Sequence, residues 1–139
     1  MISKEQLIEA AWEARKESYS PYSHYMVGAA VLGTDGKIYK GTNIENASFG
    51  ATVCAERTAI FGMINGGCRK FAALAVVGGT NGGNYPCCLC RQVMTEFCDS
   101  LNVAVYSSGP DKIIYEATLS EIVPSPFMSF VPNDDYFAK

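Results

Sequence analysis

Four residues in two short segments could together do chemistry that none of them could do alone. Cys54 and Glu56 stand two apart in Thr-Val-Cys-Ala-Glu-Arg. Cys87 and Cys90 stand three apart in Pro-Cys-Cys-Leu-Cys-Arg-Gln. Residues three apart on the first turn of a helix face the same side, so these two sulfurs can reach one ion. Three thiolates with one open position form a catalytic zinc site, whereas a structural site closes with a fourth protein ligand. The spacing therefore predicts zinc held by Cys54, Cys87 and Cys90.

The last two residues of the first cysteine segment, Glu56 and Arg57, supply complementary chemistry. A carboxylate beside an activated water can take its proton and deliver it to a ring nitrogen and to a leaving amine. Glu56 is thus the predicted acid–base catalyst, as in zinc deaminases, where the glutamate is not a ligand. Three thiolates give zinc surplus negative charge, which weakens it as a Lewis acid. A hydrogen bond from the Arg57 guanidinium to a thiolate would offset that charge, and Arg91 is a second candidate.

Other interpretations of the cysteines stay open on the sequence alone. Free cysteine is among the most buried residue types, so the three thiols could be ordinary core residues. A Cys-x-x-Cys pair can be a redox motif, although such motifs need no Cys-x-Glu elsewhere. Cys88 lies between two presumed ligands, and on a helical turn its side chain should point away from both. Cys68 and Cys98 are expected to be core or surface residues.

Periodicity and turn residues place these motifs on a series of helices and strands. Residues 3–20 open with a capping box of Ser3 and Gln6 and continue with helical spacing, and Pro21 marks the end. A glycine-bounded turn at 33–36 joins the two strands of a hairpin. The predicted order is helix 3–20, strands 27–32 and 37–43, helix 54–64, strand 72–78, helix 86–100, strands 103–107 and 113–115, and a short helix at 119–123.

Strands that alternate with helices favour an α/β fold in which crossover helices cover a sheet. We expect one domain over residues 1–139, a three-layer α-β-α arrangement with a mixed five-stranded sheet. The cysteine segments then open the second and third helices, whose N-termini can converge at the end of the sheet. A helix N-terminus carries partial positive charge and unpaired N–H groups, which stabilise thiolates. The tail from 124 to 139 contains three prolines and no predicted element.

The composition restricts the class of partner. The chain is 48% hydrophobic and 18% charged, which suits a sizeable core and disfavours disorder. The net charge of −3 and the scattered basic residues argue against a nucleic-acid or membrane-surface partner, because both need clustered Lys and Arg. Apolar runs such as 71–77 are too short to span a membrane, and residues 1–9 lack a signal-peptide pattern. We therefore expect a cytoplasmic protein with reduced cysteines and a small neutral substrate.

Together these motifs resemble the cytidine deaminase family, specifically its short, three-cysteine, homotetrameric kind. The resemblance rests on Cys-Ala-Glu at 54–56 and on Pro-Cys-x-x-Cys-Arg-Gln at 86–92. Ser-Pro-Tyr-Ser at 20–23 and Val-Gly-Ala-Ala at 27–30 are similar to the family's first strand region, and Asn-Ile-Glu-Asn-Ala-Ser at 43–48 resembles its ribose-binding segment. The motifs occur in the family's order and cover nearly the whole chain. The resemblance implies hydrolytic deamination of cytidine or deoxycytidine, with release of ammonia, in pyrimidine salvage.

The resemblance also implies which residues bind the substrate. Asn43 and Glu45 would hydrogen-bond the ribose hydroxyls, and Ala55 would line the substrate site. The residue that stacks near the pyrimidine is usually Phe and is Tyr25 here. Phe127, in a segment similar to Leu-Leu-Pro-x-x-Phe, would cap the site of a neighbouring subunit in a homotetramer.

Two other functions compete with this one. Tyr25 and Phe49 both depart from the family's usual aromatic residues, which keeps the stacking surfaces but relocates a hydroxyl group. A different aminated nucleoside is therefore an alternative substrate. A base within a polynucleotide is disfavoured, since the chain is acidic and short of strand-binding loops. A non-catalytic, zinc-stabilised assembly protein is the alternative from another class, and it would need four protein ligands and a closed site.

Overall fold

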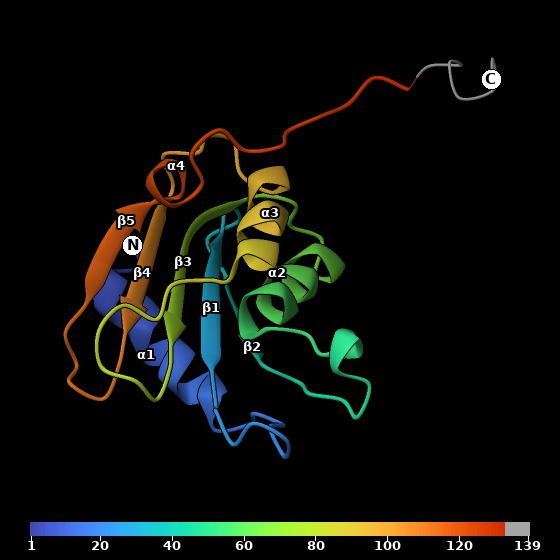
Figure 1. Ribbon diagram of the computed structural model, residues 1–139. Helices are drawn as coiled ribbons and strands as arrows, with labels where there is room; N and C mark the ends of the chain where they lie inside the picture. The colour runs from blue at the N-terminus through green and yellow to red at the C-terminus, as the bar shows by residue number, and fades with distance from the viewer. Residues whose placement is uncertain (133–139) are drawn as a thin grey trace, which may run out of the picture.

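A computed structural model describes residues 1–132 as a mixed sheet with helices on both faces (Figure 1). The strand order across the sheet is β2-β1-β3-β4-β5. Neighbours β3 and β4 are parallel, and the other three pairs are antiparallel. This confirms the predicted three-layer fold with a mixed five-stranded sheet. Residues 133–139 of the predicted domain lie outside the described part. The strands are β1 (Gly28–Gly33), β2 (Ile38–Thr42), β3 (Phe71–Val77), β4 (Ala104–Ser108) and β5 (Tyr115–Thr118).

The helices divide between the two faces of the sheet. Helix α1 packs on one face, while α2 and α3 pack side by side on the other (Figure 1). Within the described residues, no helix is long and apolar enough to cross a membrane. The helical elements are α1 (Lys4–Arg15), the short 3-10 turn η1 (Phe49–Ala51), α2 (Ala55–Asn65), α3 (Cys88–Glu96) and α4 (Leu119–Ile122).

Alternation along the central strands sends side chains to two separate cores. On β1, Ala29 and Val31 join the cluster under α2 and α3, whereas Ala30 joins the cluster under α1. On β3, Leu74 and Ala75 divide in the same way. Both central strands are thus buried on both faces, which explains why their sequences read as continuous apolar runs.

The helix that follows Cys54 packs on β2 at a glycine. A Cβ atom on Gly41 would lie 2.3 Å from the Ala59 nitrogen and 2.5 Å from the Ala55 oxygen. Only glycine permits so close an approach between helix and strand backbones. Gly41 therefore sets the distance between the sheet and the first turn of α2, where the predicted catalytic residues begin.

Two helices end earlier than the sequence predicts, because tertiary hydrogen bonds stop them. The first helix ends at Arg15 rather than near residue 20, and beyond it the Tyr19 nitrogen donates to the Asn43 oxygen at 3.1 Å, next to the end of β2. The third helix ends at Glu96 rather than near residue 100. The next residue, Phe97, uses its oxygen to accept from the Phe71 nitrogen at 2.8 Å, at the start of β3. After each helix, the backbone thus bonds to the sheet region instead of continuing the helical pattern.

The last strand also differs from its predicted position at 113–115. Residues before Tyr115 form a turn in which Asp111 Oδ1 accepts from the Ile113 nitrogen at 3.2 Å, and Lys112 has a left-handed φ of 65°. The Ser108 hydroxyl donates to the Ile113 oxygen at 2.9 Å and closes this turn. Ile113 is consequently 53% exposed rather than paired in the sheet.

Alanine substitutions at two glycines test the close packing of α2 on β2. We expect Gly41→Ala to lower the free energy of unfolding by about 1–3 kcal/mol, the usual cost of overpacking. Gly62→Ala is the matched control, because a Cβ there meets nothing within 4 Å. It should raise the free energy of unfolding by about 0.5–1 kcal/mol through helix propensity. Urea denaturation measures both, and a Gly41→Ala protein as stable as the wild type would contradict this packing.

Candidate active site

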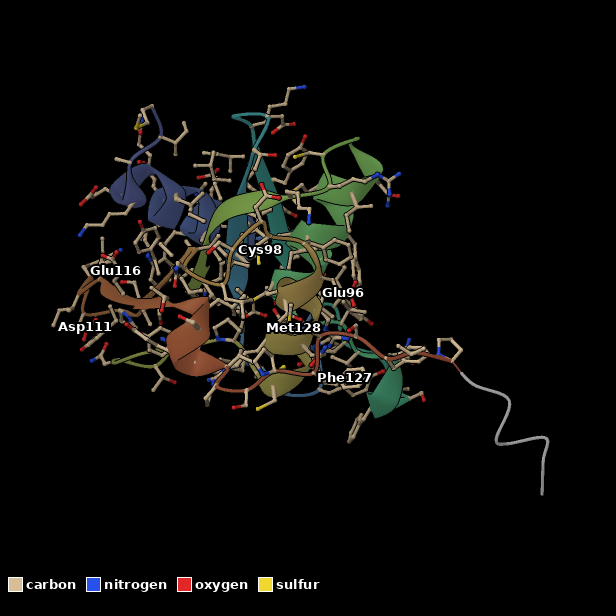
Figure 2. All side chains as sticks on the ribbon, turned by 90° about the horizontal axis from the view of Figure 1, so that it is seen from above. Glu96, Cys98, Asp111, Glu116, Phe127 and Met128 are labelled. Carbon is tan, nitrogen blue, oxygen red and sulfur yellow. The ribbon has the colours of Figure 1, made fainter. Side chains whose placement is uncertain are left out.

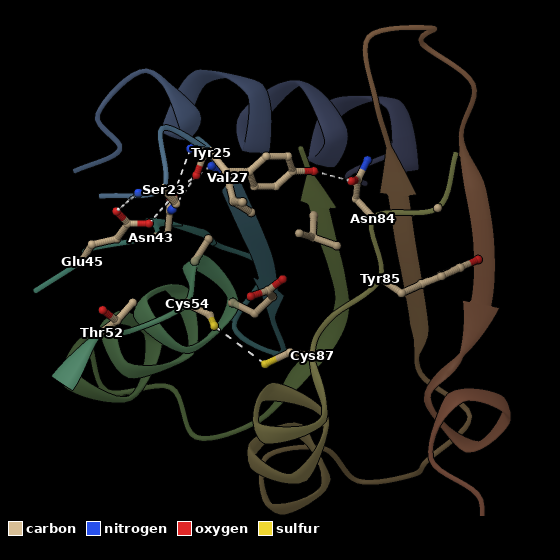
Figure 3. A pocket seen from close by; sticks show the side chains of 14 residues that line it. Ser23, Tyr25, Val27, Asn43, Glu45, Thr52, Cys54, Asn84, Tyr85 and Cys87 are labelled. Atoms are coloured by element: carbon tan, nitrogen blue, oxygen red, sulfur yellow. Dashed lines mark hydrogen bonds between the residues drawn. The ribbon is translucent and has the colours of Figure 1, made fainter. Parts of the chain in front are cut away.

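The N-termini of α2 and α3 meet and bring three cysteines together (Figure 3). Cys54 is the N-cap residue of α2 and Cys87 is that of α3, both with extended backbone, and Cys90 lies in the first turn of α3. The Cys87 sulfur lies 3.7 Å from that of Cys54 and 3.5 Å from that of Cys90. All three sulfurs lie within 4.8 Å of one another.

These thiols fit a zinc ion. Sulfur ligands lie about 2.3 Å from zinc, so that two of them in a tetrahedral site are separated by about 3.8 Å. The separations between neighbouring sulfurs match that spacing. The group contains three ligands, and two of them, Cys54 and Cys87, line a pocket. The arrangement is that of a catalytic zinc centre with a fourth position accessible to a small molecule.

The contacts within the cluster shift two thiol pKa values in opposite directions. Contact with Cys90 and then with the Arg57 guanidinium lowers the pKa of Cys54 to about 5. The contact with Cys54, together with burial, raises the pKa of Cys90. Zinc deprotonates a coordinating thiol outright, so its binding must displace the proton that Cys90 holds. Zinc affinity should therefore rise as the pH rises.

The two arginines beside the ligands have different partners. The Arg57 Nη2 donates to the Cys54 sulfur at 3.5 Å, which places its positive charge against a thiolate. Arg91, the second candidate, binds no thiol. Its Nε donates to the Pro86 oxygen at 2.6 Å and its Nη1 to the Ile122 oxygen at 2.7 Å. Arg91 thus holds the turn before Cys87 in place, and Arg57 alone lies where it can offset thiolate charge.

Glu56 lies beside the cluster at the bottom of the pocket. Its side chain is only 5% exposed, and its Oε2 accepts a hydrogen bond from the Cys90 sulfur at 3.4 Å. Burial raises the pKa of Glu56, and the nearby Cys54 thiolate adds to the shift. A carboxyl group whose pKa lies above its usual range holds a proton more readily, as a general acid must.

The pocket has a volume of about 510 Å³, a size that suits a small molecule. Four residues that the family resemblance assigns to the substrate line it, together with Cys54, Glu56 and Cys87 (Figure 3). Those four are Tyr25, Asn43, Glu45 and Ala55.

Asn43 and Glu45 also hold the wall of the pocket together. The Asn43 Nδ2 donates to the Tyr25 oxygen at 2.8 Å, and its Oδ1 accepts from the Val27 nitrogen at 3.0 Å. One amide N–H of Asn43 remains for a ligand. Glu45 accepts from the Ser23 hydroxyl and from the Ser23 nitrogen, the latter at 3.0 Å. The Ser23 hydroxyl in particular lowers the pKa of Glu45, so this carboxylate stays ionised as a hydrogen-bond acceptor.

Phe127 does not join this pocket within its own chain. It lies on the segment after α4, beside α3, and is 63% exposed (Figure 2). The Phe127 oxygen accepts from the Gln92 Nε2 at 2.8 Å, which fixes the segment to α3. A role for this side chain at a neighbouring subunit's site stays a prediction.

Several pocket residues were not predicted from the sequence. Thr52 and Val76 line the pocket, as do Asn84 and Tyr85 from the segment between β3 and α3. The glycine-rich run at 78–83, directly before the second cysteine motif, is the sequence signal that could have drawn attention to the last two.

Comparisons with known proteins agree with this geometry. Residues 1–106 match the family described as the cytidine and deoxycytidylate deaminase zinc-binding region. A cytidine deaminase of Sporosarcina psychrophila is 46% identical over 88% of this chain and 90% of its own length. A cytidine deaminase of Halalkalibacterium halodurans is 44% identical over 96% of this chain and 100% of its own length. The crystal structure of a cytidine deaminase from Burkholderia pseudomallei superposes with a TM-score of 0.86 and 42% identity, covering 91% of this chain and 100% of that one.

The fold and the three-thiol centre define an α/β protein whose cysteines fit zinc beside a pocket. The chain belongs to the cytidine and deoxycytidylate deaminase family.

Serine substitutions at the cysteines test the metal site. We expect about one zinc ion per wild-type chain after dialysis against a competing chelator. Cys90→Ser should lower zinc affinity by more than the ~10–100-fold that loss of a supporting residue costs, because a ligand itself is lost. Cys88→Ser is the matched control, since Cys88 is exposed and outside the cluster. Zinc measured by mass spectrometry checks both, and a Cys90→Ser protein that keeps its zinc would disprove this ligand set.

Proposed function

We propose that the protein is a zinc-dependent cytidine deaminase, which hydrolyses cytidine or deoxycytidine to uridine or deoxyuridine and releases ammonia. The observation that carries the proposal is the contact between buried Glu56 and the three-thiol cluster, at the bottom of a pocket lined by Asn43 and Glu45. A closed structural zinc site would need a fourth protein ligand, and the open pocket favours catalysis instead. The product of such a reaction serves pyrimidine salvage.

Glu56 moves the protons in this reaction. Zinc, when bound by the three thiolates, supplies the Lewis acid that activates a water. Glu56 takes a proton from that water and gives it to the ring nitrogen beside the amine-bearing carbon. The water oxygen bonds to this carbon. Glu56 then takes the second proton from that oxygen and delivers it to the amine as the bond from the carbon to the amine breaks, so that a carbonyl group and ammonia are formed. Burial, which raises the pKa of Glu56, helps it to hold the proton between the two transfers.

The other end of the pocket suits a sugar. Glu45 is an ionised acceptor, and Asn43 has one N–H to donate, so that the pair can bind two neighbouring ribose hydroxyls. A site built to pair with hydroxyl groups rejects a free base, because its polar groups would then be left unpaired.

The charge of the pocket favours a neutral nucleoside over a nucleotide. Among residues 1–132, the lining contains two carboxylates, Glu45 and Glu56, and no lysine or arginine. Binding of a phosphate group relies on cationic side chains or on helix N-termini, and both helix N-termini here face the thiols. The nucleoside is therefore the proposed substrate, although the family also takes its name from deoxycytidylate.

We further propose a homotetramer in the cytoplasm. Exposed apolar side chains gather on α3 and on the segment after α4, and patches of this kind mark interaction surfaces. Phe127 and Phe130 stack on each other with their ring centroids 6.5 Å apart. Cysteines of the site must stay reduced to bind zinc, which suits a reducing compartment. The members of this patch are Leu89, Phe127, Met128 and Phe130.

Glu56→Gln tests the proposed reaction. We expect the variant to keep its zinc and to lose about 10²–10⁴-fold in turnover, because an amide cannot carry the proton. The loss of cytidine absorbance and the appearance of uridine measure the rate. Glu96→Gln is the control, since this carboxylate is exposed at the end of α3. A zinc-loaded Glu56→Gln protein with the wild-type rate would refute the assignment, and an inactive wild type would refute cytidine as the substrate.

Phe127→Asp tests the assembly. Light scattering should give the wild type a mass four times the 15.0 kDa of one chain. A charge within the apolar patch should shift the protein to smaller species and lower its activity with them. Ile113→Ser removes another exposed apolar side chain, in the turn before β5, and should leave the mass unchanged. A wild type that is monomeric at micromolar concentration would rule the tetramer out.

A further inference from the structure

The segment between β3 and α3 forms one wall of the pocket. It leads from Val77 to the turn that carries Cys87 and contributes Asn84 and Tyr85 to the lining. Four of its residues are glycines, at positions 78, 79, 82 and 83. Glycine loses more conformational freedom than any other residue when it is ordered, so this wall needs specific bonds to stay in place.

Asn84 supplies most of those bonds. Its Nδ2 donates to the Thr80 oxygen at 2.6 Å and to the Ser108 oxygen at 3.0 Å, and its backbone nitrogen donates to the Ser107 hydroxyl. The amide group therefore folds the segment back on itself and attaches it to the end of β4. Its Oδ1 remains to accept a hydrogen bond from another part of the chain.

That bond comes from Tyr25, on the opposite wall (Figure 3). The Tyr25 hydroxyl donates to Asn84 Oδ1 at 2.8 Å. Its oxygen also lies 3.0 Å from the Thr80 hydroxyl oxygen, within hydrogen-bonding distance. At its other end, the Tyr25 backbone oxygen accepts from the Asn43 amide. Tyr25 thus connects the wall proposed to bind ribose with the glycine-rich wall.

Gly78 makes room for this connection. It is buried, and a Cβ atom on it would lie 2.6 Å from the Tyr25 hydroxyl oxygen and 2.8 Å from Asn84 Oδ1. Both distances are too short for real atoms, so a side chain at position 78 would push the two partners apart. The close approach of Tyr25 and Asn84 therefore depends on a glycine at this position.

We infer that the Tyr25 hydroxyl is a positioning group for substrate binding, one that holds the Asn84–Tyr85 wall against the pocket. The inference rests on the proposed function and adds to it a role for one oxygen atom. The hydroxyl bonds to Asn84 and Thr80 and makes no bond to Glu56 or the thiols. Its effect therefore falls on the affinity for the nucleoside and leaves the chemical step unchanged.

Tyr25→Phe is the direct test, because it keeps the ring and removes only the hydroxyl. We expect KM for cytidine to rise about two- to tenfold, the effect of one hydrogen bond, with kcat within twofold of the wild type. Amide hydrogen exchange within residues 78–86 should become faster in the zinc-loaded protein without substrate. Tyr106→Phe is the matched control, since Tyr106 lies on the opposite, α1 side of the sheet. It should change neither KM nor exchange.

Gly78→Ala is a second variant that should break the Tyr25–Asn84 hydrogen bond, because the added Cβ atom would displace both partners. Alone, it should raise KM as Tyr25→Phe does. In the Tyr25→Phe background it should add less than it does alone, because the hydroxyl that it displaces is already absent. Fully additive effects, an unchanged KM in Tyr25→Phe, or a loss confined to kcat would overturn the inference. If the wild type does not deaminate cytidine, the proposed function fails. The hydrogen-exchange rates then test the Tyr25–Asn84 contact independently, and unchanged exchange in Tyr25→Phe would overturn the positioning role.

Discussion

Two helices point their positive ends at one small volume, and like poles at that distance repel unless negative charge lies between them. The sulfurs of Cys54 and Cys87, the two N-cap residues, lie where that charge is needed. Negative charge at these sulfurs would therefore reduce the repulsion between the two helix N-termini, and it would also allow the cluster to bind a metal cation. The sheet enforces it, because α2 packs on β2 at Gly41 and α3 crosses between the parallel strands β3 and β4.

The burial of Glu56, the proposed acid–base group, follows from the same packing. Glu56 comes one residue after the first residue of α2, so the close approach of that helix to the sheet carries the carboxylate below the surface. There it contacts Cys90 on the other helix, and its proton affinity reflects both the low polarity of its surroundings and the nearby thiolate. A carboxylate at a solvent-exposed helix start would titrate well below neutral pH. The function proposed for Glu56 is therefore a consequence of where its helix lies.

The sequence predicted the part of the site that short spacing determines. Cys87 and Cys90 lie on one helical turn, and Glu56 follows Cys54 by two residues, so local geometry alone brings each pair together. Asn84 and Tyr85 escaped notice because the path of a glycine-rich segment depends on bonds to distant residues. The choice between Arg57 and Arg91 was open for the same reason, since both are adjacent to a ligand and only the backbone direction separates them. The ends of α1 and α3 were predicted too late for a related reason. Helical periodicity continues in the sequence, but the backbone beyond each helix forms tertiary hydrogen bonds instead.

The order of the strands has a consequence for a nascent chain on the ribosome. All three cysteines of the cluster have been synthesised once residue 90 is added, but α3 packs into a buried cluster that also contains Val105 of β4. The parallel pairing of β3 with β4 joins Val77 to Ser108 and closes over α3 as a crossover. Contacts between residues so far apart in sequence form late in folding. The folded geometry of the three-cysteine cluster is therefore completed only after β4 has emerged from the ribosome.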